Sequence, residues 1–415
     1  QYTYEAQTIQ ISPAGKTAVT ANVVDDPGYM YIPSDLSAVL GLNASEYLQV
    51  YTKYTPNPVN PWVNDAEIFV QVFGGDGGTP KPPIKLDASQ ATDGYHYAGD
   101  FALARASTGE VAVAWVDFWE GYDASSNYTE AYQLKLAILN KDGSLKKGPL
   151  TVVDLQPAVL PFPYVLKPRL AFDGQDNLAL IWNQGTYDYP DLYEFFDGDQ
   201  IHLRAFSLEG VALTADRTIT SDTASYVVHA PVTLLATENG GLLLTFSSFI
   251  DDGSGTRVFQ NNARGFSPDA LTGFTIMYTF TAVDGPFYDT LLLPDSNIMA
   301  VGDEGLTVLD GSSFEAIANS EPFLFSSKAY LYGQSFGKQA NLALASDQDV
   351  LVSFTNGTYD LNYALANLDG QLRFEPATLP FDAYSYIRTS SPYAMATLYV
   401  PPARVTPVYL PMIRR

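Results

Sequence analysis

The chain has 415 residues, no cysteine and a formal net charge of −24, because 46 acidic side chains outnumber 22 basic ones. The missing cysteine excludes disulfides, thiolate metal sites and a cysteine nucleophile, and the acidic excess argues against nucleic acids and anionic membranes as partners. No apolar run is long enough to span a bilayer, so we expect no membrane insertion. Tyrosine, phenylalanine and glycine are abundant while lysine and arginine are sparse, which favours strands and turns over helices.

The amino-terminal region predicts a single strand followed by a four-stranded unit. Gln1 in place of methionine is typical of a mature chain after removal of a signal peptide. Together with the composition, it predicts a secreted protein of the extracellular surface. Residues 2–12 form the single strand in this prediction. The unit after it spans residues 16–89, with strands around 17–23, 47–54, 67–73 and 83–86.

The middle of the chain repeats one pattern, in which an apolar strand, a short polar turn and a second apolar strand form a hairpin. The turns are rich in Gly, Asp, Asn and Ser, which tolerate tight-turn backbone angles. A second hairpin follows most of these, so each repeat predicts a four-stranded antiparallel unit. The first hairpins cover residues 101–115, 169–182, 232–246, 290–302 and 342–354. The second hairpins cover residues 134–145, 201–213, 306–314 and 361–372.

With an incomplete last unit at residues 383–400, the prediction is seven units, and four-stranded sheets repeated around an axis are the blades of a β-propeller. The chain therefore resembles a seven-bladed β-propeller, an all-β fold of four-stranded antiparallel blades, over residues 1–400. Pairing of the N- and C-terminal strands would close it and leave no exposed edge, which favours closure over an open array. The blades lack Trp-Asp ends, kelch glycine pairs, sialidase Asp boxes and Asp-rich calcium loops, so the resemblance implies no functional subfamily.

Acidic residues cluster with aromatic ones after several second strands, as in the segment that holds Glu120 and Asp123. A glycosidase needs two carboxyl groups flanking the bond that it cleaves, and tryptophan rings can stack on sugars. The alternative is that aspartates in turns cap local amides and keep the surface soluble, and we favour it because no pair stands out. The residues of this candidate ligand face are Trp115, Asp117, Trp119, Trp182, Asp188 and Asp360.

No other motif predicts a catalytic or cofactor site. The three histidines, His96, His202 and His229, lack the spacing of metal ligands. Nucleophile elbows and phosphate-binding loops are missing, so we expect no cofactor, although the acidic loops leave calcium open without the spacing of a calcium motif. Three Asn-x-Ser/Thr sequons predict a glycoprotein if the host glycosylates asparagine. They begin at Asn43, Asn127 and Asn356.

Residues 401–415 form a Pro-punctuated apolar tail that ends in two arginines. Its prolines favour an extended edge or polyproline-like path. The tail could lie along its own propeller, add to a neighbouring copy, or act as a secretion or surface-retention signal. The residues expected to make its contacts are Val405, Val408, Tyr409, Leu410, Ile413, Arg414 and Arg415.

These observations predict an extracellular structural protein without enzymatic activity, which self-assembles through its terminal segment into a filament or surface array. Its main partner would then be further copies of itself. The alternative is a secreted propeller that binds or cleaves glycans with acidic and aromatic residues of its central face. A tail seated on another copy would favour assembly, whereas a convergent pair of carboxylates beside an exposed aromatic ring would favour the alternative.

Overall fold

The computed structural model describes much of the chain as strands and tight turns. The described residues are 5–11, 17–23, 37–43, 46–56, 64–74, 81–88, 94–159, 161–187, 196–220, 227–237, 240–251, 257–266, 274–280, 287–302, 305–311, 313–320, 340–355 and 361–378.

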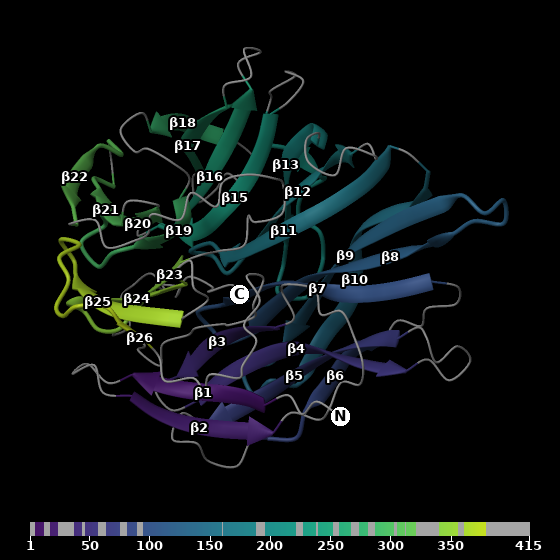
Figure 1. Ribbon diagram of the computed structural model, residues 1–415, viewed down its shortest axis with the longest axis horizontal. Helices are drawn as coiled ribbons and strands as arrows, with labels where there is room; N and C mark the ends of the chain where they lie inside the picture. The colour runs from purple at the N-terminus through teal and green to yellow at the C-terminus, as the bar shows by residue number, and fades with distance from the viewer. Residues whose placement is uncertain are drawn as a thin grey trace.

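Six four-stranded antiparallel sheets follow one another along the described residues, and each is a blade of a β-propeller (Figure 1). The strands of each blade are hydrogen-bonded in chain order. Blade 1 holds β3 (Ser37–Asn43), β4 (Glu46–Pro56), β5 (Asn64–Gly74) and β6 (Ile84–Ala88). Blade 2 holds β7 (Gly94–Arg105), β8 (Val111–Tyr122), β9 (Tyr128–Leu139) and β10 (Leu145–Ala158). Blade 3 holds β11 (Phe162–Phe172), β12 (Leu178–Tyr187), β13 (Phe196–Phe206) and β14 (Arg217–Thr218).

The last three blades have the same design. Blade 4 holds β15 (Val227–Ala236), β16 (Leu242–Asp251), β17 (Arg257–Phe266) and β18 (Phe274–Phe280). Blade 5 holds β19 (Phe287–Leu292), β20 (Ile298–Gly302), β21 (Gly305–Leu309) and β22 (Ala316–Asn319). Blade 6 holds β23 (Ala340–Leu344), β24 (Asp349–Thr355), β25 (Leu361–Asn367) and β26 (Ala377–Thr378).

The predicted number of seven blades is wrong, because the described residues form six. The strand expected to open the first unit, β2 (Thr17–Val23), pairs with β1 (Glu5–Ile11) in a separate two-stranded sheet. The first strand of blade 1 is instead β3, which pairs with β4. Residues 383–400, the predicted last unit, lie outside the described residues, as does any strand pairing that would close the ring there.

Tight turns join the strands because glycines adopt backbone angles that other residues avoid. Gly143 has φ 88° in the β9–β10 turn, where its N–H donates to the carbonyl of Asn140 at 2.9 Å. Gly210 has φ 73° in the equivalent turn of blade 3 and donates to the carbonyl of Ser207 at 2.9 Å. Both positions belong to the left-handed region that favours glycine, which explains the repeated glycine of the predicted hairpins.

The hydrophobic core lies between consecutive blades, where facing sheets bury their apolar side chains. Leu48 and Ile68 of blade 1 share one cluster with Val113 and Trp115 of blade 2. Each of the first strands β3, β7, β11, β15 and β19 contacts the first strand of the next blade along the chain, which for β19 is β23. Each blade is therefore held mainly by its neighbours in sequence.

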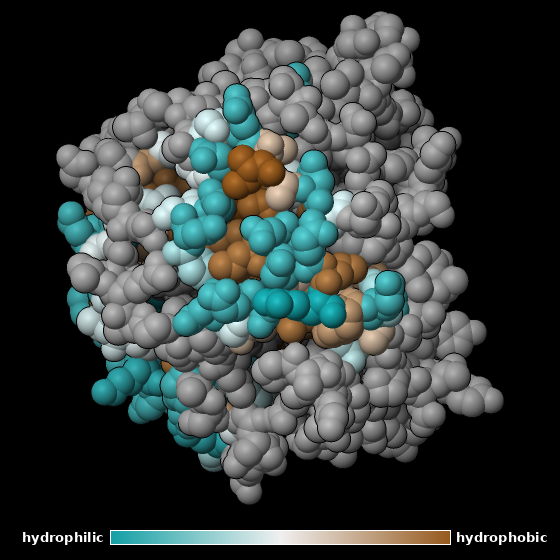
Figure 2. Space-filling view, turned by 90° about the vertical axis from the view of Figure 1, so that its left-hand side faces the viewer, coloured by the Kyte–Doolittle hydropathy of each residue, from teal (hydrophilic) through white to brown (hydrophobic). Residues whose placement is uncertain are grey.

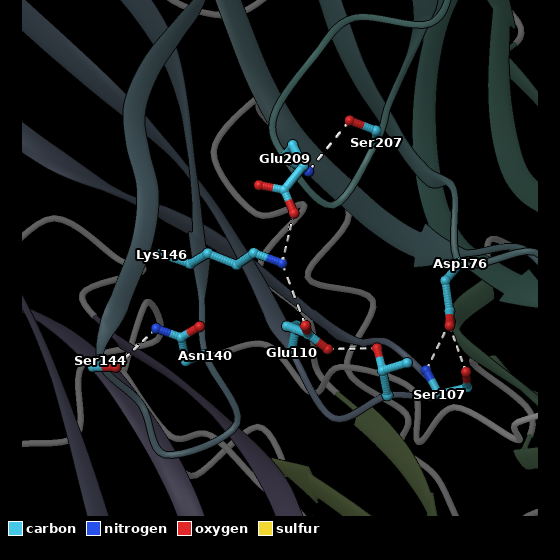
Figure 3. Close-up of polar contacts among 9 residues, drawn as sticks. Ser107, Glu110, Asn140, Ser144, Lys146, Asp176, Ser207 and Glu209 are labelled. Carbon is cyan, nitrogen blue, oxygen red and sulfur yellow. Dashed lines mark hydrogen bonds and ion pairs between the residues drawn. The ribbon is translucent and has the colours of Figure 1, made fainter.

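Polar contacts add to this packing between blades. Asp289 of β19 is fully buried and accepts hydrogen bonds from Thr233 Oγ1 of blade 4 at 2.8 Å and from the backbone N–H of Leu342 of blade 6 at 3.0 Å. At the turns, Figure 3 shows Asp176 of blade 3 accepting hydrogen bonds from the backbone N–H and hydroxyl of Ser107 in blade 2. The buried carboxylate of Asp289 thus joins blades 4, 5 and 6.

The side of the molecule formed by the last two blades carries apolar groups among hydrophilic ones (Figure 2). Ile317, on the edge strand β22 of blade 5, is 55% exposed. No described segment is a helix with the length and apolar character needed to cross a membrane.

Candidate functional site

The two faces of the β8–β9 pair carry different chemistry. Successive residues of a strand point to opposite faces. Val113 and Trp115 belong to the cluster shared with blade 1, whereas Ala114 and Val116 belong to the cluster shared with blade 3. Continuing this alternation, Asp117 and Trp119 face blade 1, and Phe118, Glu120 and Tyr122 face blade 3. The candidate site lies on the second of these faces.

Two glutamates oppose each other across β8 and β9. Glu120 is the direct register partner of Glu130, and like charges at directly opposed positions destabilise a sheet. The Tyr128 hydroxyl contacts both, at 2.8 Å from Glu120 Oε2 and 3.1 Å from Glu130 Oε1. These two carboxyl oxygens therefore lie at most about 6 Å apart, which is below the separation of about 6.5–9.5 Å found in inverting glycosidases.

The tyrosine between the carboxylates keeps its proton. Burial, the hydrogen bond to Glu120 and the negative charge of Glu130 all raise the pKa of Tyr128 well above its ordinary value. The single hydroxyl proton can serve only one carboxylate at a time. Tyr128 therefore acts as a neutral hydrogen-bond donor between the two glutamates.

Aromatic residues surround the carboxyl pair. The hydroxyls of Tyr97 and Tyr132 lie 3.3 Å from Glu120 Oε1 and 3.4 Å from Glu130 Oε2. Phe162, which opens blade 3, packs edge-on against Tyr128 with ring centroids 5.4 Å apart. Glu130 is 5% exposed and Glu120 is half-buried, so the pair has one inner and one outer member. We refer to Glu120, Tyr122, Tyr128 and Glu130 as the carboxylate–tyrosine site.

The turn beside this site is ordered by an aspartate, as the favoured interpretation of acidic loop residues predicts. Asp123 accepts hydrogen bonds from the backbone N–H groups of Ser125 and Asn127, at 2.8 and 2.9 Å, and from Asn127 Nδ2 at 3.0 Å. The Asn127 side-chain bond, followed by these backbone bonds, lowers the pKa of Asp123. Asp123 therefore caps a turn.

The opposite face of the strands holds a buried ion-pair network, which we call the Lys135 network. Lys135 Nζ lies 2.6 Å from Asp117 Oδ2 and 2.6 Å from Asp87 Oδ2 of blade 1. His96 Nε2 lies 3.6 Å from Asp117 Oδ1, and the His96 ring stacks on Trp119 with centroids 4.8 Å apart. These contacts tie blade 2 to blade 1, and Asp117, at 1% exposure, is inaccessible to a large ligand.

The other residues of the predicted ligand face are not brought together with Asp117 and Trp119. Trp115 is fully buried in the core between blades 1 and 2. Trp182 is fully buried in the core between blades 2 and 3. Trp182 stacks on His202 with centroids 5.5 Å apart. Asp188, Asp360 and residues 401–415 of the tail lie outside the described residues.

The described sequon asparagines occupy different settings. Asn127 is exposed in the β8–β9 turn, and Asn43 lies at the end of β3, where its Nδ2 donates to Glu46 Oε2 at 2.9 Å. Asn43 lines an open cleft of about 390 Å³ together with Glu46, Lys81 and other charged residues. This cleft lies at the other end of the blades from the β8–β9 turn. Asn356 lies outside the described residues.

No cluster of potential metal ligands occurs among the described residues. His202 Nδ1 lies 3.0 Å from Asp216 Oδ1, and the side chain of His229 is not among the described ones. The possibility of calcium in the Asp-rich loops thus stays a sequence prediction, supported so far by no described ligand group.

Sequence reasoning missed Tyr122, Tyr128 and Glu130. Glu130 follows the β8–β9 turn in the segment Tyr128–Thr129–Glu130, which contains no recognisable motif. The usable signal was the hairpin itself, since pairing across the turn brings Glu130 opposite Glu120. The predicted repeat had begun the second hairpin of this blade only at residue 134.

Comparisons with known proteins find only distant structural similarities. No protein-family model matches the chain, and no curated protein matches it. Among solved structures, an α-L-arabinanase from Penicillium chrysogenum in complex with arabinobiose has a TM-score of 0.46 at 11% identity, covering 83% of this chain and 96% of that one. An α-L-arabinofuranosidase from Fusarium graminearum has a TM-score of 0.42 at 13% identity, covering 94% and 95%. The polysaccharide lyase Uly1 has a TM-score of 0.44 at 10% identity, covering 97% and 83%. Likenesses this distant leave the chemistry to be argued from the chain's own residues, which form a β-propeller of four-stranded antiparallel blades.

Proposed function

We propose that this protein is a glycan-cleaving β-propeller, in which Glu120 and Glu130 form the pair of carboxyl groups that hydrolyses a glycosidic bond. The observation that carries the proposal is their direct opposition across β8 and β9, with the protonated hydroxyl of Tyr128 between them. A like-charged pair costs stability in a sheet. Such a cost beside the half-buried Glu120 is typical of a functional site.

The separation of the carboxyl groups favours the retaining reaction. Retaining glycosidases hold their carboxyl groups about 5–5.5 Å apart, and inverting enzymes hold them about 6.5–9.5 Å apart. In the retaining reaction one carboxyl group protonates the glycosidic oxygen while the other carboxylate attacks the anomeric carbon, so that the aglycone leaves and a glycosyl ester forms. The first group then deprotonates a water molecule, which hydrolyses the ester and restores both groups.

Tyr128 has a supporting role in this proposal. Because its pKa is raised, it stays a neutral donor and does not act as a nucleophile near neutral pH. Its hydroxyl holds the outer carboxylate, Glu120, at a fixed place relative to Glu130. A secreted location belongs to the same proposal, since a polysaccharide substrate is encountered outside the cell. Self-assembly has less support than glycan cleavage, because the tail on which it depends lies outside the described residues.

The test is hydrolysis of neutral polysaccharides, measured as the release of reducing ends by the wild-type chain and by E120Q and E130Q. Each isosteric variant should lose about 100-fold or more in kcat/KM, the usual contribution of a general acid or base. Glu315→Gln is the matched control, because Glu315 is an exposed carboxylate in blade 5 and should leave activity unchanged. Wild-type activity that survives in both E120Q and E130Q would remove these residues from the reaction, and failure of the wild-type chain on every glycan would refute the proposed function.

A further inference from the structure

The most exposed member of the carboxylate–tyrosine site is Tyr122, whose exposure is 70%. It stands two residues after Glu120 at the end of β8, and residues two apart share a face of the strand at a spacing of about 7 Å. The ring of Tyr122 and the carboxylate of Glu120 therefore project on the same side of blade 2. An exposed ring beside a paired set of carboxyl groups is suited to hold a ligand with an apolar face.

Tyr122 is also held in place before any ligand binds. It directly precedes the turn that Asp123 orders through Ser125 and Asn127. Its ring packs edge-on against Tyr128, with centroids 5.9 Å apart and planes at 75°. A ring fixed in this way loses little conformational entropy on binding, which is the advantage of a pre-organised contact.

The charge of the site restricts what can bind there. Glu120 and Glu130 oppose each other on the strands that carry this ring and its neighbour Tyr128, and Asp123 begins the adjoining turn, in a chain whose formal net charge is −24. A substrate with carboxylate or sulfate groups would be repelled by these charges. A neutral sugar avoids this repulsion and offers hydroxyl groups to the carboxylates.

Exposure restricts how the substrate lies. Tyr122 is 70% exposed and Glu120 is half-buried, and an exposed platform, unlike an enclosed pocket, does not restrict binding to the end of a chain. We propose, on the basis of the proposed function above, that Tyr122 is the stacking platform for a sugar ring of an uncharged polysaccharide, which lies along the surface of blade 2 and is cleaved at internal bonds. In this proposal Tyr122 binds the sugar ring, and the neighbouring carboxylates exclude anionic polysaccharides.

The binding test uses affinity electrophoresis in the inactive E120Q background, with xylan, arabinan and mixed-linkage β-glucan as neutral probes and polygalacturonate as the anionic probe. The loss of one aromatic contact should raise the Kd of the preferred neutral glycan about tenfold in Y122A, while Y122F should stay within about twofold of its parent. The matched control is Val211→Ala, which removes an apolar side chain that is 60% exposed on blade 3. It should bind like its parent.

The product test follows the wild-type chain on the same glycan. Cleavage of internal bonds should lower the viscosity early and yield mixed oligosaccharides. Unchanged affinity in Y122A, stronger binding of polygalacturonate than of every neutral glycan, or monosaccharide as the sole early product would each overturn the inference. If the early product is monosaccharide but its release still depends on Glu120 and Glu130, the proposed function stands and only the inference about Tyr122 fails.

Discussion

Replacing Lys135 by methionine should destabilise the protein far more than the same substitution at an exposed lysine. Its ammonium group lies 2.6 Å from each of two carboxylates, and the side chains of Lys135, Asp117 and Asp87 are 11%, 1% and 16% exposed. Methionine keeps the length and the apolar stem of the side chain but leaves Asp117 buried without its cation. Removing one partner of a buried ion pair costs about 3–5 kcal/mol.

The same substitution at Lys146 provides the control. Lys146 also contacts two carboxylates, Glu209 at 3.0 Å and Glu110 at 3.4 Å (Figure 3), but the Glu209 side chain is 72% exposed. Water can solvate these carboxylates after the cation is lost, so Lys146→Met should cost about 0–1 kcal/mol. The two variants therefore lose the same ammonium group between two carboxylates and differ in how deeply those carboxylates are buried.

The assay is denaturant unfolding followed by tryptophan fluorescence, with the midpoint and the slope compared among the wild-type chain, K135M and K146M. Burial by itself favours the neutral amine, but Asp117 and Asp87 outweigh it and raise the pKa of Lys135 above its ordinary value. A raised pKa in the folded state means that the stabilisation is complete below the unfolded pKa of about 10.4 and is lost as pH rises through the folded value. Equal costs for the two variants at neutral pH would refute the argument that burial sets the magnitude.

Three further predictions concern the reaction, the alkaline limit and the contact between blades. If Glu120 and Glu130 act as proposed, the first product seen by NMR should keep the anomeric configuration of the substrate, and inversion would contradict the short carboxyl separation. Because the pKa of Tyr128 is raised by folding, wild-type stability should fall as pH rises above about 10, and Y128F should show a smaller fall in urea titrations at about pH 9 and pH 11. Gly174→Ala would bring a Cβ within 2.7 Å of the Gly240 Cα in the next blade, where the Gly174 N–H donates to the Gly240 carbonyl at 2.9 Å. It should cost about 1–3 kcal/mol in the same unfolding assay, and an unchanged midpoint would contradict this close approach.

The repeated hairpins could be predicted from sequence because each is local. An apolar run, a turn with glycine or aspartate and a second apolar run specify pairing between residues a few positions apart. The number of blades could not be predicted in the same way. Residues 17–23 have the alternation of a blade strand, but their partner is the preceding strand Glu5–Ile11, a choice that depends on competition between pairings.

The predicted ligand face and the carboxylate–tyrosine site share strand β8 and lie on its opposite faces. Sequence reasoning singled out residues around Trp115 and Trp119 because tryptophan and aspartate are the residues expected to bind sugars. In the structure Trp115 is fully buried toward blade 1, while Glu120 and Tyr122 point the other way. Which face of a strand is accessible depends on the neighbouring blades, and the hydropathy of β8 alone does not distinguish the two.

The contact between each blade and the next has a consequence for how the protein is made. Since each first strand touches the first strand of the following blade, a blade emerging from the ribosome finds the surface that it needs already synthesised. Blades 1 and 2 supply all residues of the Lys135 network, so that network can form while half of the chain is still untranslated. The edge of the newest blade stays uncovered until the next one arrives, and a translational pause at a blade boundary would lengthen that exposure.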